Sequence, residues 1–139
     1  MICNLRYSVL ALAAALVFSG ACSRSTSQDA PLTPEGKAYV RNLLLSDVAM
    51  KATESYSKQV LTEIEGNVRN SGDRTVERVE VTAYFYDRYS QLVLRERVPI
   101  VKKTFKPGES RRFRLAFDDI PDTWNNQMPQ LVIAQVVFG

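Results

Sequence analysis

Hydrophobic and polar residues alternate along much of this 139-residue chain, and this alternation limits what the chain can fold into. In the segment QVLTEIEGNVRN, every second residue from Val60 to Val68 lies on one face, and the charged Glu63 and Glu65 lie on the other. Because successive side chains of a strand point to opposite sides, a period of two indicates a strand with one buried face.

Later segments continue this period and are separated by turn sequences. In VERVEVTAYFYD, every second residue from Val79 to Phe85 is predicted to face inward, as are Phe113, Leu115 and Phe117 in RRFRLAF. The intervening NSGD and FKPGES have the residue types that turns with positive φ prefer. The final segment, LVIAQVVF, is apolar on both faces, which predicts a central or partly covered strand.

The segment EGKAYVRNLLLSDVAMKATES combines helical and alternating spacings. We interpret it as a short helix or extended lead-in to about residue 45, followed by a strand over residues 46–54. The chain then holds six or seven strands, spaced roughly ten residues apart. This spacing favours an all-β fold, an antiparallel β-sandwich.

The chain begins with a short apolar run. VLALAAALVF, residues 9–18, is shorter than the roughly 20 apolar residues that a membrane-spanning helix needs, and it suits the core of a signal peptide. The small residues Ser19, Gly20 and Ala21 follow, and Cys22 comes directly after them. We therefore predict a signal peptide over residues 1–21, with cleavage between Ala21 and Cys22.

The segment SGAC resembles the bacterial lipobox, although Ser19 stands where that motif prefers leucine. The resemblance implies that Cys22 carries acyl chains such as palmitate and anchors the protein in a membrane, and Ser23 implies sorting to the outer membrane. The alternative is ordinary secretory cleavage, which would leave Cys22 as a free thiol open to oxidation.

The segment that follows is predicted to be a tether. SRSTSQDAPLTP is rich in Ser, Thr and Pro and has no periodicity, as in flexible linkers. We therefore expect the lipidated Cys22 and a flexible tether over residues 22–41, and a β-sandwich domain over residues 42–139.

Composition excludes several kinds of chemistry. The chain has no histidine, and its two cysteines, Cys3 and Cys22, lie in its first 22 residues. Zinc sites and Ser-His or Cys-His nucleophiles depend on these residue types, so we expect no metal, no cofactor and no enzyme activity. A weaker alternative is a carboxylate hydrolase that uses Glu63 or Glu65 with Asp118. The formal net charge of +3 is too small to indicate nucleic acid as a partner.

Two long segments, IEGNVRNSGDRTVERVEVTAYFYDRYSQLV and FKPGESRRFRLAFDDIPDTWN, resemble the FxLYD-type and DUF2393-like domains of bacterial envelope proteins. The shared pattern is a strand with GxVxNxG, a strand ending in YxYD, a PG turn before an FxLxF strand, and IPxxW. The likeness covers about residues 42–138, with YFYD where FxLYD is expected. It implies an immunoglobulin-like sandwich of six or seven strands and supplies no catalytic residues.

Three tyrosines form the predicted binding surface. Tyr84 and Tyr86 lie on the opposite face of their strand from Phe85, and Tyr89 follows in the next turn. An exposed row of tyrosines would suit a glycan or a peptide. The alternative is that these tyrosines pack against cross-strand neighbours on the outer face of the sheet, where tyrosine is common.

Two charged clusters have simpler interpretations. The carboxylates of Asp118, Asp119 and Asp122, with Asn125 and Asn126, could hold Ca²⁺, but we favour turn and capping roles for them. For the basic cluster we favour protection of a strand edge over contact with anionic lipid phosphates. Its members are Lys102, Lys103, Lys106, Arg111, Arg112 and Arg114.

These observations predict a non-enzymatic lipoprotein of the bacterial cell envelope, on the periplasmic face of the outer membrane. We expect it to be anchored through Cys22 and to act as a structural or interaction module, by protein–protein contact or strand addition to an envelope protein. The alternative function is a glycan- or peptide-binding module that uses the Tyr84 and Tyr86 face.

Overall fold

The computed structural model describes residues 30–54 and 60–139, and they form six strands preceded by one short helical segment. The predicted signal peptide, its cleavage site and Cys22 lie outside the described residues. The elements, in chain order, are α1 (Pro34–Tyr39), the 3₁₀ turn η2 (Val40–Asn42), β1 (Leu43–Glu54), β2 (Val60–Asn70), β3 (Val76–Tyr86), β4 (Leu92–Val101), β5 (Ser110–Phe117) and β6 (Gln130–Phe138).

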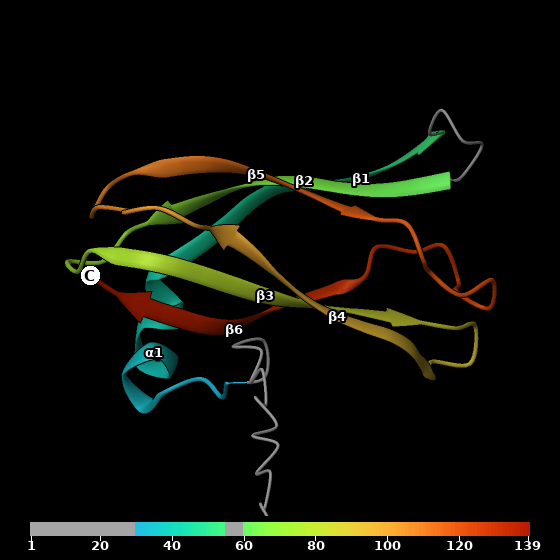
Figure 1. Ribbon diagram of the computed structural model, residues 1–139, viewed down its shortest axis with the longest axis horizontal. Helices are drawn as coiled ribbons and strands as arrows, with labels where there is room; N and C mark the ends of the chain where they lie inside the picture. The colour runs from blue at the N-terminus through green and yellow to red at the C-terminus, as the bar shows by residue number, and fades with distance from the viewer. Residues whose placement is uncertain (1–29, 55–59) are drawn as a thin grey trace, which may run out of the picture.

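The strands form two three-stranded antiparallel sheets that face each other (Figure 1). Sheet A has the order β1-β2-β5, and sheet B has the order β4-β3-β6. The order of sheet A matches strands A-B-E of an immunoglobulin sandwich, and the order of sheet B matches strands C′-C-F. The predicted fold class, an all-β antiparallel sandwich of six or seven strands, is therefore confirmed, and the described residues form six strands.

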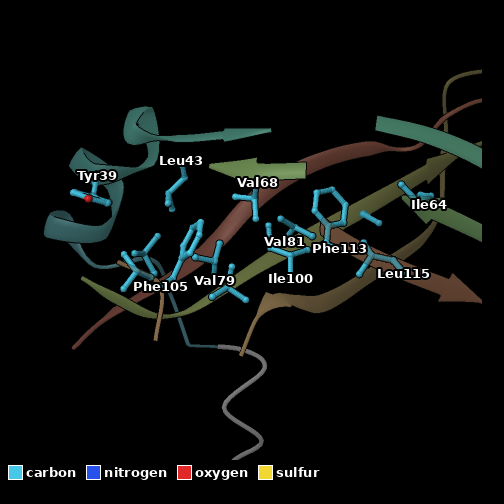
Figure 2. Packing of buried hydrophobic residues seen from close by; sticks show 14 of the residues in the cluster. Tyr39, Leu43, Ile64, Val68, Val79, Val81, Ile100, Phe105, Phe113 and Leu115 are labelled. Carbon is cyan, nitrogen blue, oxygen red and sulfur yellow. The ribbon is translucent and has the colours of Figure 1, made fainter. Parts of the chain in front are cut away.

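The core lies between the sheets and contains the residues that the alternation placed inward (Figure 2). From β3, every second residue from Val79 to Phe85 is fully buried. From β2 and β5, Ile64, Val68 and Phe117 meet them from the opposite sheet. Phe85 and Phe117 pack edge to face, with ring centroids 5.0 Å apart, and so join the two sheets. Alternation alone located the buried faces of these three strands correctly.

The first strand differs from its prediction because it begins earlier. β1 starts at Leu43 rather than at residue 46, and the helix ends at Tyr39. A bulge interrupts the pairing with β2 between Ser46 and Ala49, and Asp47 in this bulge has φ 53°. The extra residue shifts the alternation partway along the strand. This shift explains why the segment showed no single period.

Part of the predicted tether is folded. Thr33 caps α1 by accepting a hydrogen bond from the Gly36 amide, and Pro34 occupies the first helical turn. The buried Tyr39 donates its hydroxyl to Asn70 Oδ1 at 2.7 Å and packs edge to face on Phe138 of β6. Residues 34–41 are therefore not a flexible tether, and the folded unit begins before the predicted boundary at residue 42.

The last strand is partly covered, as one interpretation of its sequence predicted, but it is not central. Among the described residues, β6 pairs only with β3 and forms one edge of sheet B. The helix α1 lies beside its C-terminal part, where Gly36 approaches Val136 (Figure 1). Val132 and Val137 remain 41% and 38% exposed. The helix therefore covers the C-terminal part of β6 where Val136 is buried, and apolar side chains of the outer face remain partly exposed.

Candidate functional site

The three predicted tyrosines lie along one side of the molecule but do not form one site. Tyr84 and Tyr86 are half-buried on the outer face of sheet B, and Tyr89 in the β3–β4 turn is 75% exposed. Each lines a different hollow of the surface. The Tyr86 hydroxyl lies 3.4 Å from Gln130 Oε1 on β6, a cross-strand contact of the kind that the packing interpretation predicted.

The hollow beside Tyr84 lies on the outer face of sheet B and is dominated by charged side chains. Arg95 stands opposite Tyr84 in the β3–β4 register, and Arg97 stands opposite Thr82. Ala30 and Pro31 form another wall, so the chain that leads into α1 crosses this face. A surface tyrosine therefore lies beside two arginines and the N-terminal segment.

A buried carboxylate holds this face together. Glu80 on β3 is 1% exposed, and its two carboxylate oxygens accept hydrogen bonds at 2.8 Å from Arg78 Nε and Arg97 Nε. Arg97 also donates from Nη1 to the carbonyl of Ala30 at 2.8 Å. A buried charge is tolerated only when it is paired and hydrogen-bonded, and both conditions are met here. The cluster fixes the N-terminal segment to sheet B.

At one end of the sandwich, the β3–β4 turn is joined to the loop between β5 and β6. Asp87 forms an isolated β-bridge with Trp124, and the amide of Asn125 donates to the carbonyl of Tyr86 at 3.0 Å. Trp124 packs edge to face on the core residue Phe85, with ring centroids 5.5 Å apart. The two loops are therefore held against each other and against the core.

The β3–β4 turn is fixed from within as well. The Asp87 carboxylate accepts hydrogen bonds from the amides of Tyr89 and Gln91, at 2.8 and 2.9 Å, and the Gln91 carbonyl accepts one from the Asp87 amide. Ser90 takes the left-handed conformation, φ 62°, that closes the turn. Tyr89 thus extends into solvent from a rigid backbone.

A hollow of about 720 Å³ lies between these two loops, and we call it the loop hollow. Its walls are mainly amide, carboxylate and hydroxyl side chains together with two aromatic rings. The lining residues are Asp87, Arg88, Tyr89, Ser90, Asp122, Thr123, Trp124, Asn125, Asn126 and Gln127. Sequence reasoning selected Tyr89 and, separately, Asp122, Asn125 and Asn126, but it did not place them together, because only the tertiary fold brings residues 122–127 beside residues 87–90.

The aspartates Asp118, Asp119 and Asp122 lie around a turn that backbone groups close, and the capping role that we favoured for their side chains stays a prediction. The Trp124 amide donates to the carbonyl of Pro121 at 3.0 Å, which closes a turn. In residues 30–54 and 60–139, no group of three His, Cys, Asp or Glu side chains is arranged to hold a metal ion, so the Ca²⁺ alternative is not supported. Burial, and then the nearby carboxylates of Asp118 and Asp119, raise the pKa of Glu96 above its usual value.

The basic residues of β5 pair with acidic residues of β2 across the outer face of sheet A. Arg114 donates to both oxygens of Glu63 at 2.6 and 2.7 Å, and Arg112 donates to Glu65 at 2.7 Å. Lys51 of β1 reaches the same Glu65 at 3.1 Å. Hydrogen bonds from Arg112 and Lys51 lower the pKa of Glu65, and the hydrogen bond to Glu63 raises the pKa of Arg114.

These ion pairs on the outer face of sheet A bear on two alternatives from the sequence, a carboxylate hydrolase and a contact with lipid phosphates. The carboxylates considered for a hydrolase, Glu63 and Glu65, are bound by arginines on an outer sheet face. Arg111 donates to the backbone carbonyls of Lys103 and Thr104 and to Glu109, so it holds the β4–β5 turn rather than facing a lipid phosphate. Lys102, Lys103 and Lys106 are exposed in that turn.

The edge strand β6 differs from every other strand in composition. Its sequence QLVIAQVVF contains no charged residue and no proline, whereas each of β1 to β5 carries at least one charged side chain. Edge strands commonly carry charge, proline or bulges that prevent pairing with other chains. A bulge at Ala134, where the register with β3 shifts, is the one such feature in β6. Sequence reasoning missed this edge because pairing order is not a local property.

Comparison with known proteins places the chain in a family. The family model described as "Protein of unknown function (DUF2393)" matches residues 46–133, more than half of the chain. One solved structure, described as the X-ray structure of Northeast Structural Genomics Consortium target SoR45, is similar. It has a TM-score of 0.43 and 12% sequence identity, and the alignment covers 70% of this chain and 86% of that chain. No curated protein matches.

In the described residues, no helix is both long and apolar enough to cross a membrane. The FxLYD likeness is not tested by these comparisons and stays a prediction.

Proposed function

The chain belongs to the DUF2393 family, and we propose that it is a lipoprotein of the bacterial cell envelope that acts as a non-enzymatic protein-interaction module. In this proposal, acyl chains on Cys22 hold the protein at the periplasmic face of the outer membrane. One acyl chain gives only marginal anchoring, so the several chains of a lipobox cysteine are needed for stable attachment. The sandwich domain then contacts an envelope protein.

The observation that carries this proposal is the edge of β6. Half of the backbone N–H and C=O groups of an edge strand point away from its sheet, and an extended segment of another protein can pair with them. The N-terminal part of β6, before the stretch that α1 covers, presents Val132 at 41% exposure and no charge. An extended apolar segment can therefore add to sheet B at this edge.

The other edges are less suited to this role. β1 carries the bulge at Asp47 together with Lys51, and β4 carries Pro99, which cannot donate a ladder hydrogen bond. β5 has a charged side chain at Arg111, Arg112 and Arg114. The contrast supports β6 as the pairing edge.

The interaction is tested by placing a charge on this edge. We expect Val132→Lys to abolish co-purification of the envelope protein that accompanies the wild-type chain, since a lysine on an edge strand opposes added strands. Ala116→Lys is the matched control, because Ala116 is exposed on the outer face of sheet A. Equal recovery of the same protein with Val132→Lys would rule out this edge as the contact.

The anchor is tested separately. Cells fed a tagged palmitate should label the wild-type protein but not Cys22→Ser, and the variant should leave the membrane fraction. If wild type carries no label and Cys22→Ser still sediments with membranes, the lipid anchor is wrong. The result for Val132→Lys remains informative in either case, because the edge of β6 does not depend on Cys22.

A further inference from the structure

We propose that the loop hollow binds a neutral sugar ring. This site lies at the end of the sandwich and shares no lining residue with β6, and the inference does not depend on that proposed function. The hollow has a volume of about 720 Å³, within the range of about 300–1,000 Å³ that is usual for small-molecule sites. It is therefore large enough for a sugar unit.

The hollow is formed before any ligand arrives. The bridge between Asp87 and Trp124, the hydrogen bond from the Asn125 amide to Tyr86, and the bonds that Asp87 accepts within its own turn hold both loops in place. A site that is already ordered loses less conformational entropy when it binds. Tyr89 is thus a large aromatic side chain that is highly exposed on a rigid turn, which is an arrangement suited to recognition rather than to packing.

The chemistry of the walls matches a sugar better than other ligands. A pyranose ring has an apolar C–H face, which an aromatic ring such as Tyr89 can cover, and hydroxyl groups that both donate and accept hydrogen bonds. Asn126 and Gln127 are exposed amides that can donate and accept, Asp122 accepts, and Thr123 does both. Few aliphatic groups line the hollow, so it does not suit an apolar ligand.

Charge makes neutral sugars the favoured class. Arg88 is the single basic side chain of the lining, and two carboxylates, Asp87 and Asp122, accompany it. A sulfated or phosphorylated ligand would therefore be repelled. A peptide is also disfavoured, because backbone groups of both loops are already hydrogen-bonded to each other.

The chain contains a single tryptophan, Trp124, and it lies in this hollow, so its fluorescence reports on the site directly. The full chain, extracted from membranes in detergent, is titrated with cellotriose and with the trimer of N-acetylglucosamine, both neutral. We expect a saturable change in emission with at least one of them at millimolar concentration. A sulfated disaccharide should give none.

Tyr89→Ala should weaken binding by about tenfold, because it removes an aromatic contact, whereas Tyr89→Phe should keep it. Since the Tyr89 side chain is mostly exposed, these variants are expected to fold normally, and unfolding curves check this. Tyr84→Ala is the matched control, because Tyr84 lies on the same sheet but lines a different hollow. Loss of binding in Tyr84→Ala but not in Tyr89→Ala would assign the sugar to the sheet face instead.

The proposal is overturned if neither neutral sugar changes the emission, or if only the sulfated sugar does. It is also overturned if Tyr89→Ala binds as wild type does. None of these outcomes bears on the edge of β6, since Val132→Lys and Tyr89→Ala alter separate surfaces.

Discussion

The outer faces of the two sheets use the same pair of side chains, arginine and glutamate, in opposite ways. On sheet A, Arg112 pairs with Glu65, and the side chains of the arginine and the glutamate are 71% and 15% exposed. On sheet B, Glu80 is buried between Arg78 and Arg97, and the N-terminal segment crosses above it. Burial, rather than pairing, therefore determines how much such an ion pair contributes to the stability of the fold.

The two faces also leave different edges to the solvent. Sheet A ends in β1 and β5, which both carry charges, whereas sheet B ends in the charged β4 and in β6, which has a bulge but no charged residue. The outer face of sheet B, where Glu80 is buried, is thus bounded by β6. This is the edge strand whose composition does least to prevent pairing with another chain. The charged edges of sheet A oppose pairing with other chains, and in our proposal the edge of β6 in sheet B accepts a strand.

Removing the buried charge should produce the largest effect. Glu80→Gln keeps the size of the side chain but leaves Arg97 buried without a counter-ion, so we expect the free energy of unfolding to fall by about 3 kcal/mol. Urea unfolding measures this change. The matched variant on sheet A, Glu65→Gln, should have a much smaller effect, and equal losses in the two variants would contradict the comparison.

A smaller loss of stability is expected when only the hydrogen bond that holds the N-terminal segment to sheet B is removed. Arg97→Lys keeps the positive charge beside Glu80 but cannot reach Glu80 and the carbonyl of Ala30 together, because lysine lacks the guanidinium fork. We expect a loss of about 1 kcal/mol and faster proteolysis before α1. Unchanged protease sensitivity of that segment would show that Arg97 does not hold it.

The smallest expected effect is on how the stability of the fold depends on pH. Because the folded protein lowers the pKa of Glu65 below its usual 4.5, this carboxylate stabilises the fold above that pH, and its contribution is lost as the pH falls through the lowered value. Glu65→Gln should therefore flatten the loss of stability below about pH 5, measured by urea unfolding at several pH values. A steeper acid limb in the variant would contradict the assigned contacts.

The pKa of Glu96 is shifted in the opposite direction from that of Glu65. Burial and the neighbouring aspartates raise its pKa, so the folded state favours the protonated form, and stability falls as the pH rises through the raised value. Glu96→Gln should remove this decline, and comparison with Glu65→Gln separates the two carboxylates. The same unfolding series measures both, and a decline that persists in Glu96→Gln would assign it to another group.

The sequence was sufficient for elements whose signal is local. Alternation placed Val79 and Phe85 inward, and Pro107-Gly108 marked a turn in which Gly108 has φ 83°. The helix α1 lies in the segment that we interpret as a short helix or extended lead-in to about residue 45, although the tether predicted over residues 22–41 also covers it. Its own signals, Thr33 as cap and Pro34 in the first turn, were present but short.

What could not be predicted depends on contacts between distant segments. The position of β6 at an edge follows from its pairing with β3 alone, and its apolar sequence fits a central strand equally well. The burial of Glu80 requires Arg97, 17 residues away, and Tyr89 and Trp124 line one hollow only because Asp87 and Trp124 form a β-bridge between two loops. Tyr84, Tyr86 and Tyr89 were correctly placed toward the surface, but their division among separate hollows needed the fold.

The central claim is that another protein adds to sheet B along β6, and site-specific photocrosslinking in cells tests it most directly. A photoreactive residue placed at Val132 should form an adduct with one envelope protein, and the same residue at Ala116 on sheet A should form none. The adduct should disappear when Ala134, two residues further along the strand, is changed to lysine. Adducts of equal yield from both positions, or from Ala116 alone, would contradict the account.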